Sequence, residues 1–290
     1  MEVIAIDEDR CTRCGLCIPV CVRGILELAE DAVTVSKPAQ CILCGHCKAI
    51  CPEDAPQFPS LDDREFSPAP GREEMPHPDG LMALFRSRRS TRIYQKRAVE
   101  REKILQILEA GRFAPNGGNR QHLQYTVVQS EEHILKVRQM ALSVLRDMAH
   151  KIQRALREKR ARGEAFSVTD VALEADAEWL LHMPELLRRG IDRLFYFAPA
   201  VIVCHGDPQS RTVEVDAGLA GMQMALMAEA FGLGTCFCHA LVLAVRVSGA
   251  LRQALQISED RKAVLSFMVG YPDVTYRRLV ARNPVTAKWL

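Results

Sequence analysis

The sequence predicts an α+β protein with a small cysteine-rich domain followed by a larger domain built on one central sheet. Three observations predict this division. Eight of the 11 cysteines fall within the first 51 residues, residues 56–78 contain six of the 15 prolines, and the remaining residues alternate helical and strand patterns. At 290 residues the chain also exceeds the usual length of a single domain. We therefore expect domains at residues 1–57 and 79–290, joined by a linker at 58–78.

The cysteines of the first domain form two runs with the same spacing, C-x-x-C-x-x-C-x-x-x-C. Three thiolates on one tight loop, with a fourth from elsewhere, suit a cubane of iron and sulfide, because each corner needs one sulfur ligand. Structural zinc is the alternative, but zinc sites usually pair two C-x-x-C knuckles or include histidine. Disulfides are disfavoured, because we expect no secretory signal. The runs consist of Cys11, Cys14, Cys17 and Cys21, and of Cys41, Cys44, Cys47 and Cys51.

Both runs resemble those of the two-cluster ferredoxins of bacteria, in which the fourth cysteine of each run ligates the other cluster. The resemblance implies two [4Fe-4S] clusters, one held by Cys11, Cys14, Cys17 and Cys51, and the other by Cys41, Cys44, Cys47 and Cys21. Between the runs, residues 24–28 and 32–35 alternate apolar and polar side chains as a small hairpin would. Such a domain has almost no apolar core, so we expect the clusters themselves to hold it together.

The second domain is expected to begin near Asp79, after a stretch in which prolines and charges indicate a fairly stiff linker. Apolar periodicity, helix caps and short β-branched runs then place its elements. Strands that alternate with helices indicate one central sheet. The predicted helices span 79–85, 99–111, 214–231 and 244–255, with a mostly helical block at 131–195 that is interrupted near 157–163 and restarts at Ser167; the predicted strands span 123–129, 198–204, 234–238 and 263–269.

Composition argues against several classes of function. Charged residues make up 26% of the chain and hydrophobic residues 48%, with a net charge of +2, which favours neither a nucleic-acid binder nor a disordered chain. The longest apolar stretch, residues 217–233, is too short for a membrane span and contains Gln223 and Glu229. The three cysteines outside the runs, Cys204, Cys236 and Cys238, indicate reduced thiols. We expect a cytoplasmic protein that binds neither nucleic acid nor a membrane.

Four arginines and a serine gather just after the first predicted helix of the second domain. Guanidinium forks and a hydroxyl match phosphate oxygens geometrically, so this group is a candidate anion site. The alternative is a solvated basic helix end. The group comprises Arg86, Arg88, Arg89, Ser90 and Arg92.

Four segments of the second domain carry recognisable signatures. Residues 88–92 read R-R-S-T-R, residues 114–121 read A-P-N-G-G-N-R-Q, residues 232–235 read G-L-G-T, and the G-Y-P of residues 270–272 precedes the R-N-P of residues 282–284. In this order they resemble the nitroreductase family of flavin mononucleotide (FMN) enzymes, with Asn116 in place of the usual serine. The resemblance implies an α/β sandwich with a central, mostly antiparallel sheet.

The resemblance also implies which residues contact the cofactor. The phosphate would be bound by Arg88, Arg89, Ser90 and Arg92, and also by Arg278 or Arg282. The ring and ribityl chain would lie along Pro115, Asn116, Asn119 and Gln121. The flavin N5 and O4 edge would lie near Phe237, Cys238 and His239.

His239 is the candidate catalytic residue, because a histidine beside the flavin can donate a proton near neutral pH. The alternative is a histidine satisfied within the core or at a dimer interface. We expect Cys236 and Cys238 to be buried structural residues. We expect Met222, Met224 and Met227 to be buried or to lie in a dimer core.

Members of the family are intertwined homodimers with each flavin at the subunit interface. The resemblance therefore implies that residues 214–231 form the dimer core and that residues 280–290 are an arm that crosses to the partner. The helical block at 143–195 lies where the family places its variable substrate lid.

The two domains together suggest an FMN-dependent oxidoreductase. Each cluster carries one electron, whereas a flavin takes one or two. We expect electrons from an external low-potential donor to pass through the two clusters to FMN and on to a small organic acceptor, such as a nitro compound or a quinone. The external donor is expected to be ferredoxin or NAD(P)H, and NAD(P)H reduces most free-standing relatives by binding over the flavin. The alternative is an electron-transfer or redox-sensing flavoprotein that serves a protein partner and reduces no small molecule.

Overall fold

The computed structural model describes residues 3–290, and the chain divides into two compact units. The first unit extends to Pro76 and also includes Gly118–Arg120. The second unit comprises His77–Gly117 and Gln121–Leu290. Across residues 3–290, no helix combines the length and the apolar composition that crossing a bilayer requires.

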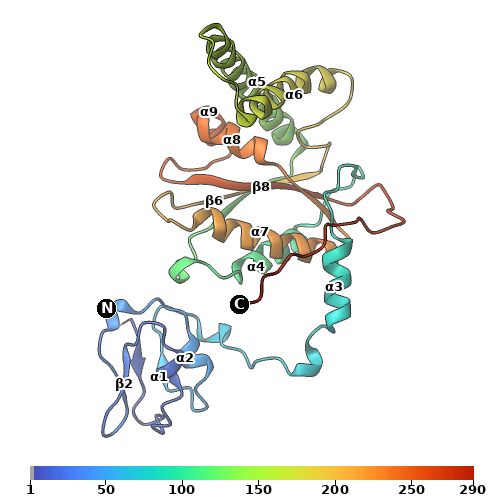
Figure 1. Ribbon diagram of the computed structural model, residues 1–290. Helices are drawn as coiled ribbons and strands as arrows, with labels where there is room; N and C mark the ends of the chain where they lie inside the picture. The colour runs from blue at the N-terminus through green and yellow to red at the C-terminus, as the bar shows by residue number, and fades with distance from the viewer. Residues whose placement is uncertain (1–2) are drawn as a thin grey trace. The chain divides into compact units, whose positions relative to one another are not determined.

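The first unit combines two small antiparallel sheets with two short helices (Figure 1). Strand β1 (Ala5–Ile6) pairs with β4 (Pro56–Gln57). The expected hairpin is formed by β2 (Leu26–Leu28) and β3 (Val33–Val35), with Leu26 opposite Val35. Helices α1 (Cys17–Val20) and α2 (His46–Ala49) each begin within or next to a cysteine run, which brings the two runs close to each other.

The expectation that this unit lacks an apolar core is wrong. Ile4, Ile25 and Val33 are buried around the cluster cysteines, and Phe58 joins them with 4% of its surface exposed. The ring of Phe66 stacks on Phe58 with 6.3 Å between centroids, and the buried Lys48 ammonium lies 5.5 Å from the Phe66 ring centre. Two aromatic side chains of the proline-rich stretch thus pack on the first unit. The prolines predict a linker here, but this part of the stretch belongs to the folded unit.

The buried ammonium group of Lys48 also holds the proline-rich stretch on the first unit. Lys48 Nζ lies 2.6 Å from Asp54 Oδ1 and 3.4 Å from Asp63 Oδ1, and it donates to the Pro56 carbonyl at 3.2 Å. Short 3-10 turns follow at Asp63–Glu65 and Arg72–Glu74. The part of this stretch nearest the cysteines is therefore held in place, whereas the sequence predicts a linker throughout.

The second unit is built on a four-stranded sheet with the order β5-β6-β8-β7, in which each neighbouring pair is antiparallel. This confirms the predicted α+β fold with its antiparallel sheet. The strands are β5 (Gln124–Val128), β6 (Ala200–Gly206), β7 (Gly234–Phe237) and β8 (Lys262–Gly270). Every residue of β6 is buried, as a central strand covered on both faces requires.

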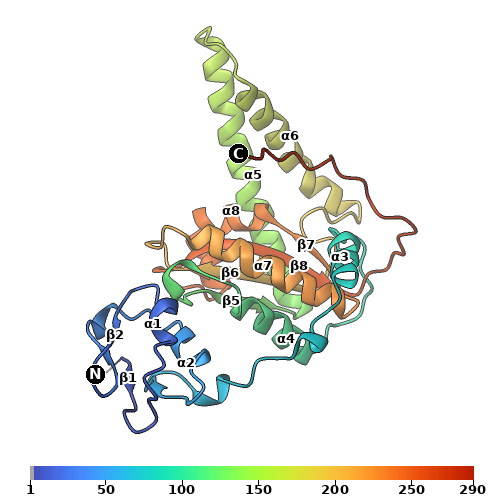
Figure 2. The same ribbon diagram turned by 60° about the horizontal axis from the view of Figure 1, so that its bottom comes forward.

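Helices cover both faces of this sheet (Figures 1 and 2). On one face, α4 (Arg101–Arg112) and α7 (Val213–Ala230) pack on Ala200 and Ile202 of β6. On the other face, α5 (Glu131–Ala161), α6 (Val168–Arg188), α8 (His239–Val247) and α9 (Gly249–Ala254) join a core with Val201 and Val203. The alternation along β6 follows from the two-residue period of a strand. Helix α3 (Pro78–Ser87) precedes these elements.

Two helices begin at residues that differ from the predicted ones. The predicted helix at 244–255 is two helices, which separate at Ser248, because this side chain accepts a hydrogen bond from Leu251 N and caps α9. The first of them already begins at His239. Helix α3 is capped by His77 with Pro78 at its first position, rather than by Asp79 or Gly80. The restart of the helical block is as predicted, with Ser167 and Asp170 forming a capping box.

Candidate functional site

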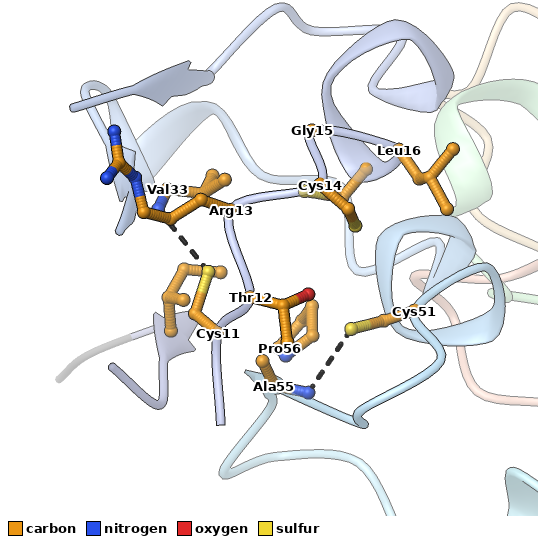
Figure 3. Close-up of a pocket in the computed structure, with 12 residues that line it drawn as sticks. Cys11, Thr12, Arg13, Cys14, Gly15, Leu16, Val33, Cys51, Ala55 and Pro56 are labelled. Carbon is orange, nitrogen blue, oxygen red and sulfur yellow. Dashed lines mark hydrogen bonds between the residues drawn. The ribbon is translucent and has the colours of Figure 1, made fainter. Parts of the chain in front are cut away.

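The eight cysteines of the first unit line two separate cavities of equal size, about 340 Å³ of empty space each. The first cavity is surrounded by Cys11, Cys14, Cys17 and Cys51, and the second by Cys21, Cys41, Cys44 and Cys47. Figure 3 shows the first cavity, where Cys51 faces the loop that carries Cys11 and Cys14. Each cavity therefore receives three cysteines from one run and the last cysteine of the other run.

Backbone amides donate to several of these sulfurs. Val33 N lies 3.5 Å from Cys11 Sγ and Ala55 N lies 3.4 Å from Cys51 Sγ at the first cavity (Figure 3), and Leu43 N lies 3.4 Å from Cys41 Sγ at the second. Such hydrogen bonds stabilise thiolates and adjust the reduction potential of a cluster. The donor set suits sulfur ligands that carry negative charge.

The cavities fit iron–sulfur clusters better than single ions. Within residues 3–290, no group of three or more His, Cys, Asp or Glu side chains converges closely enough to hold one metal ion. Burial raises the pKa of the Cys47 thiol to about 12, so a thiolate there needs positive charge beside it. Iron at the corner of a cubane supplies that charge, and four sulfurs spread around a cavity match its corners.

In the second unit, the arginine segment lies against strand β7. Arg88 is the C-cap of α3. Ser90 forms an isolated bridge with Thr235, and Thr91 N donates to the Thr235 carbonyl at 2.8 Å. A Cβ atom on Gly234 would come within 2.2 Å of Thr91 Oγ1, so this position needs glycine. The R-R-S-T-R and G-L-G-T signatures, which are far apart in the sequence, thus form one site.

Some residues in or next to the arginine segment have a buried polar atom without a hydrogen-bond partner. In the described residues these atoms include Arg88 Nε, Tyr94 Oη and Thr235 Oγ1. Leaving such atoms unpaired costs about 1–3 kcal/mol each, so native proteins rarely do so without a ligand or a water. A phosphate would accept a hydrogen bond from the buried Arg88 donor, so the arginine segment fits the anionic end of FMN.

Two aromatic rings lie on the guanidinium groups of this segment. The Arg89 guanidinium lies 3.8 Å from the Tyr276 ring centre and donates to the Arg278 carbonyl at 3.1 Å. The Arg92 guanidinium lies 5.9 Å from the Tyr196 ring centre. Arg282 is exposed, and its guanidinium donates to the neighbouring Ala281 carbonyl. Of the two C-terminal arginines, Arg278 is the one whose backbone meets the arginine segment.

The other predicted cofactor loop follows α4 and borders an open cavity with about 900 Å³ of empty space. Asn116 and Gln121 line this cavity together with leucines of α4, Tyr125 and Asp216. Asn116 Oδ1 accepts a hydrogen bond from Gln121 N at 2.9 Å, which closes the loop between them. Asn119 belongs to the first unit, where its Nδ2 donates to the carbonyls of Ile42 at 3.0 Å and Leu43 at 2.8 Å.

The arginine segment and the Asn116 loop lie at opposite ends of α7. Gly117 N contacts Asp216 in the first turn of the helix, whereas Thr91 contacts Gly234, just beyond the C-cap Phe231. Figures 1 and 2 both show α3 at one end of α7 and the segment that follows α4 at the other. With 18 residues, α7 is about 27 Å long. FMN is shorter than this, so one molecule does not reach both groups of one chain.

The three residues predicted near the flavin edge have different surroundings. Phe237 and His239 are exposed, whereas Cys238 is buried and its thiol donates to the Leu194 carbonyl at 3.5 Å. Burial raises the pKa of Cys238 to about 12. Cys236 lies beside the arginine segment, where burial raises its pKa while Arg92 and Ser90 oppose that shift. Cys204, Cys236 and Cys238 are all buried free thiols, as expected.

Several residues of the two sites carry no sequence signal of their own. Tyr196, Tyr276 and Thr235 meet the arginine segment only through folding. The one available signal is a charge within an apolar helix: Asp216 is buried in α7, and a buried carboxylate needs partners.

Comparisons with known proteins assign both units to families. The model described as the nitroreductase family matches residues 85–271, and the model described as a 4Fe-4S dicluster domain matches residues 3–52. A ferredoxin of Methanothermococcus thermolithotrophicus is 35% identical over 54 residues, which cover 18% of this chain and 90% of the ferredoxin. Ferredoxin-3 of a Nostoc species is 34% identical over 68 residues, with 17% of this chain and 70% of that protein covered.

Two solved structures show the same fold as the second unit. A nitroreductase with bound FMN from Desulfitobacterium hafniense has a TM-score of 0.52 at 22% identity, over 71% of this chain and 97% of that one. Oxidized iodotyrosine deiodinase bound to FMN and 3-iodo-L-tyrosine has a TM-score of 0.50 at 17% identity, over 72% of this chain and 98% of that one.

Proposed function

The chain belongs to the nitroreductase family and carries a 4Fe-4S dicluster ferredoxin domain ahead of it, and from this premise we propose that it is an iron–sulfur flavoprotein oxidoreductase. Single electrons from a low-potential donor such as reduced ferredoxin would pass through two [4Fe-4S] clusters to FMN and on to a small organic acceptor. NAD(P)H, as a hydride donor, would instead reduce FMN directly. Bound FMN would convert one-electron transfers into a two-electron reduction. The observation that carries this proposal is the presence in one chain of two four-cysteine cavities and an arginine site with unpaired buried polar atoms.

The chain's own residues have separate roles in this proposal. Cys11, Cys14, Cys17 and Cys51 hold one cluster, and Cys21, Cys41, Cys44 and Cys47 hold the other, in agreement with the two cavities. The FMN phosphate would be bound by Arg88, Arg89, Ser90 and Arg92, next to Thr235 of β7. His239 is exposed at the start of α8 and remains the candidate proton donor.

We further propose that two copies of the chain share each FMN site. The arginine segment and the Asn116 loop of one chain lie at opposite ends of α7, so a second copy must supply one of them. Helix α7 offers a suitable contact. Val215, Leu219 and Met222 repeat with heptad spacing on its exposed side, with 63%, 43% and 37% of their surfaces exposed. Because the opposite side of α7 is buried in the core, the helix is apolar all round, as one covered on both sides would be.

The shared site makes a prediction about Leu219. Leu219→Glu places a charge in the centre of the exposed α7 stripe, where burial against a second copy would cost several kcal/mol. We expect this variant to sediment as a monomer and to purify with little flavin. Leu135→Glu is the matched control, because Leu135 has 42% of its surface exposed on α5, away from the stripe. A Leu219→Glu protein that remains dimeric would contradict the proposed interface.

Anaerobic purification followed by iron and flavin analysis tests the proposed function. We expect about eight iron atoms per FMN, as two four-iron clusters require. Reduced ferredoxin and NADPH are then compared as donors, with a nitroaromatic compound and a quinone as acceptors. Steady acceptor consumption supports the oxidoreductase. Flavin reduction with no consumption of any acceptor favours an electron-transfer or sensing protein instead.

A further inference from the structure

A single buried carboxylate holds both ends of the loop that carries Asn116 and Gln121. Asp216, in the first turn of α7, has only 2% of its surface exposed. Its Oδ1 accepts a hydrogen bond from Gly117 N at 3.0 Å. Its Oδ2 accepts one from Thr212 Oγ1 at 3.0 Å and lies 3.2 Å from His122 Nε2. The carboxylate therefore contacts the residue after Asn116 and the residue after Gln121.

The surroundings of His122 fix where its proton lies. Its Nδ1 accepts a hydrogen bond from Asp207 N at 3.1 Å, so the neutral ring carries its proton on Nε2 and donates it to Asp216. The backbone of His122 is held as well, because Arg261 donates to the His122 carbonyl and, at 3.1 Å, to the His205 carbonyl. His122 is a fixed support for the loop rather than a mobile surface group.

The loop itself is in a conformation that needs such support. Gln121 has φ of 48°, which is in the left-handed region and costs about 1–3 kcal/mol for a residue with a side chain. A Cβ atom at Gly117 would lie 2.2 Å from Thr212 Oγ1, so the backbone of the loop approaches α7 as closely as glycine allows. A strained loop held against a buried charge is pre-organised, and pre-organisation reduces the ordering cost of binding.

The partners of Asp216 show which part of the protein its carboxylate holds in place. A buried carboxylate costs more than a well-packed apolar side chain of similar size, even with the helix N-terminus to favour its charge. The hydrogen-bonding groups that face Asp216 are Gly117 N, His122 Nε2 and Thr212 Oγ1, and two of these belong to the loop. The charge stabilises one loop conformation and leaves the packing of the sheet to other residues.

We propose that Asp216 is a positioning residue, which presets Asn116 and Gln121 for the flavin through Gly117 and His122. The inference rests on the proposed function, since it takes Asn116 and Gln121 as flavin contacts. It adds a residue outside every signature of the sequence, and it assigns the half-buried His122 a role in cofactor affinity.

The test is Asp216→Asn, which keeps the size of the side chain. Its amide N–H group would face the Thr212 hydroxyl and His122 Nε2, which both donate to the carboxylate in the wild type. When flavin-free protein with its clusters in place is titrated with FMN, we expect a Kd about 10- to 100-fold weaker. Amide hydrogen exchange of residues 113–122 in the flavin-free protein should become faster. Donor-driven turnover should return to near the wild-type rate at saturating FMN, because bound flavin then orders the loop, whereas a general structural defect would persist.

Two further variants complete the test. Gly117→Ala displaces the loop from Thr212 without touching the carboxylate, and the same loss of FMN affinity is expected even if Asp216→Asn folds poorly. Asp147→Asn is the matched control on the exposed side of α5, with wild-type affinity expected. Wild-type FMN affinity in both Asp216→Asn and Gly117→Ala would overturn the inference. Absence of FMN binding by the wild-type protein would instead overturn the proposed function.

Discussion

Replacing Cys44 with alanine is expected to reduce turnover driven by a one-electron donor to the background rate, while the flavin stays bound. Cys44 is one of four cysteines around the second cavity, and each corner of a cubane needs its own sulfur. A relay that lacks one cluster does not deliver electrons from the first cluster to the flavin. The measurement is anaerobic turnover with reduced ferredoxin, accompanied by iron analysis and electron paramagnetic resonance of the dithionite-reduced protein.

Two comparisons make the Cys44→Ala result specific. Cys204→Ala removes a thiol that is buried in β6 of the second unit, and it should leave the iron content and the ferredoxin-driven rate unchanged. Direct chemical reduction of the flavin should still support acceptor consumption in Cys44→Ala. Unchanged ferredoxin-driven turnover in Cys44→Ala would show that electrons reach the flavin without passing through the second cluster.

Local chemistry explains what the sequence could predict. The geometry of a cluster sets the spacing of its cysteines, so eight thiols at short intervals are enough to predict two four-sulfur sites, and the two cavities agree with them. Helix periodicity and caps placed α7 within one residue at each end and the restart of α6 at Ser167. The antiparallel sheet came from the family resemblance, and its strand order supports that resemblance.

Long-range contacts explain what the sequence could not predict. The packing of Phe58 and Phe66 on the first unit could not be predicted, because prolines indicate a linker whether or not the segment packs on its neighbour. The separation of α8 from α9 depends on one serine side chain that caps a helix. His122 and Asp216 are 94 residues apart, and only the folded chain brings them within hydrogen-bond distance. The sequence likewise does not indicate that the arginine segment and the Asn116 loop lie at opposite ends of α7.

Arg88→Ala is expected to weaken FMN binding by roughly 10- to 150-fold, which corresponds to about 1.5–3 kcal/mol for a hydrogen bond to a charged group. The physical reason is an unsatisfied donor. Arg88 is the C-cap residue of α3, and its buried Nε has no hydrogen-bond partner among the described residues. A phosphate would satisfy this donor with charge-assisted hydrogen bonds. Equilibrium titration of flavin fluorescence against flavin-free protein measures the change.

The outcome of Arg88→Ala separates the phosphate site from a solvated basic helix end. Arg154→Ala is the matched control, because Arg154 is an exposed arginine of α5, and loss of one positive charge there should leave FMN affinity unchanged. The iron content of both variants should equal that of the wild type, because the cluster cysteines lie in the other unit. If Arg88→Ala retained full affinity, the unpaired Nε would be a structural feature of the α3 terminus, and the phosphate would have to bind elsewhere. A loss confined to Arg88→Ala instead ties the buried donor to the cofactor, because both variants remove the same charge from the same unit.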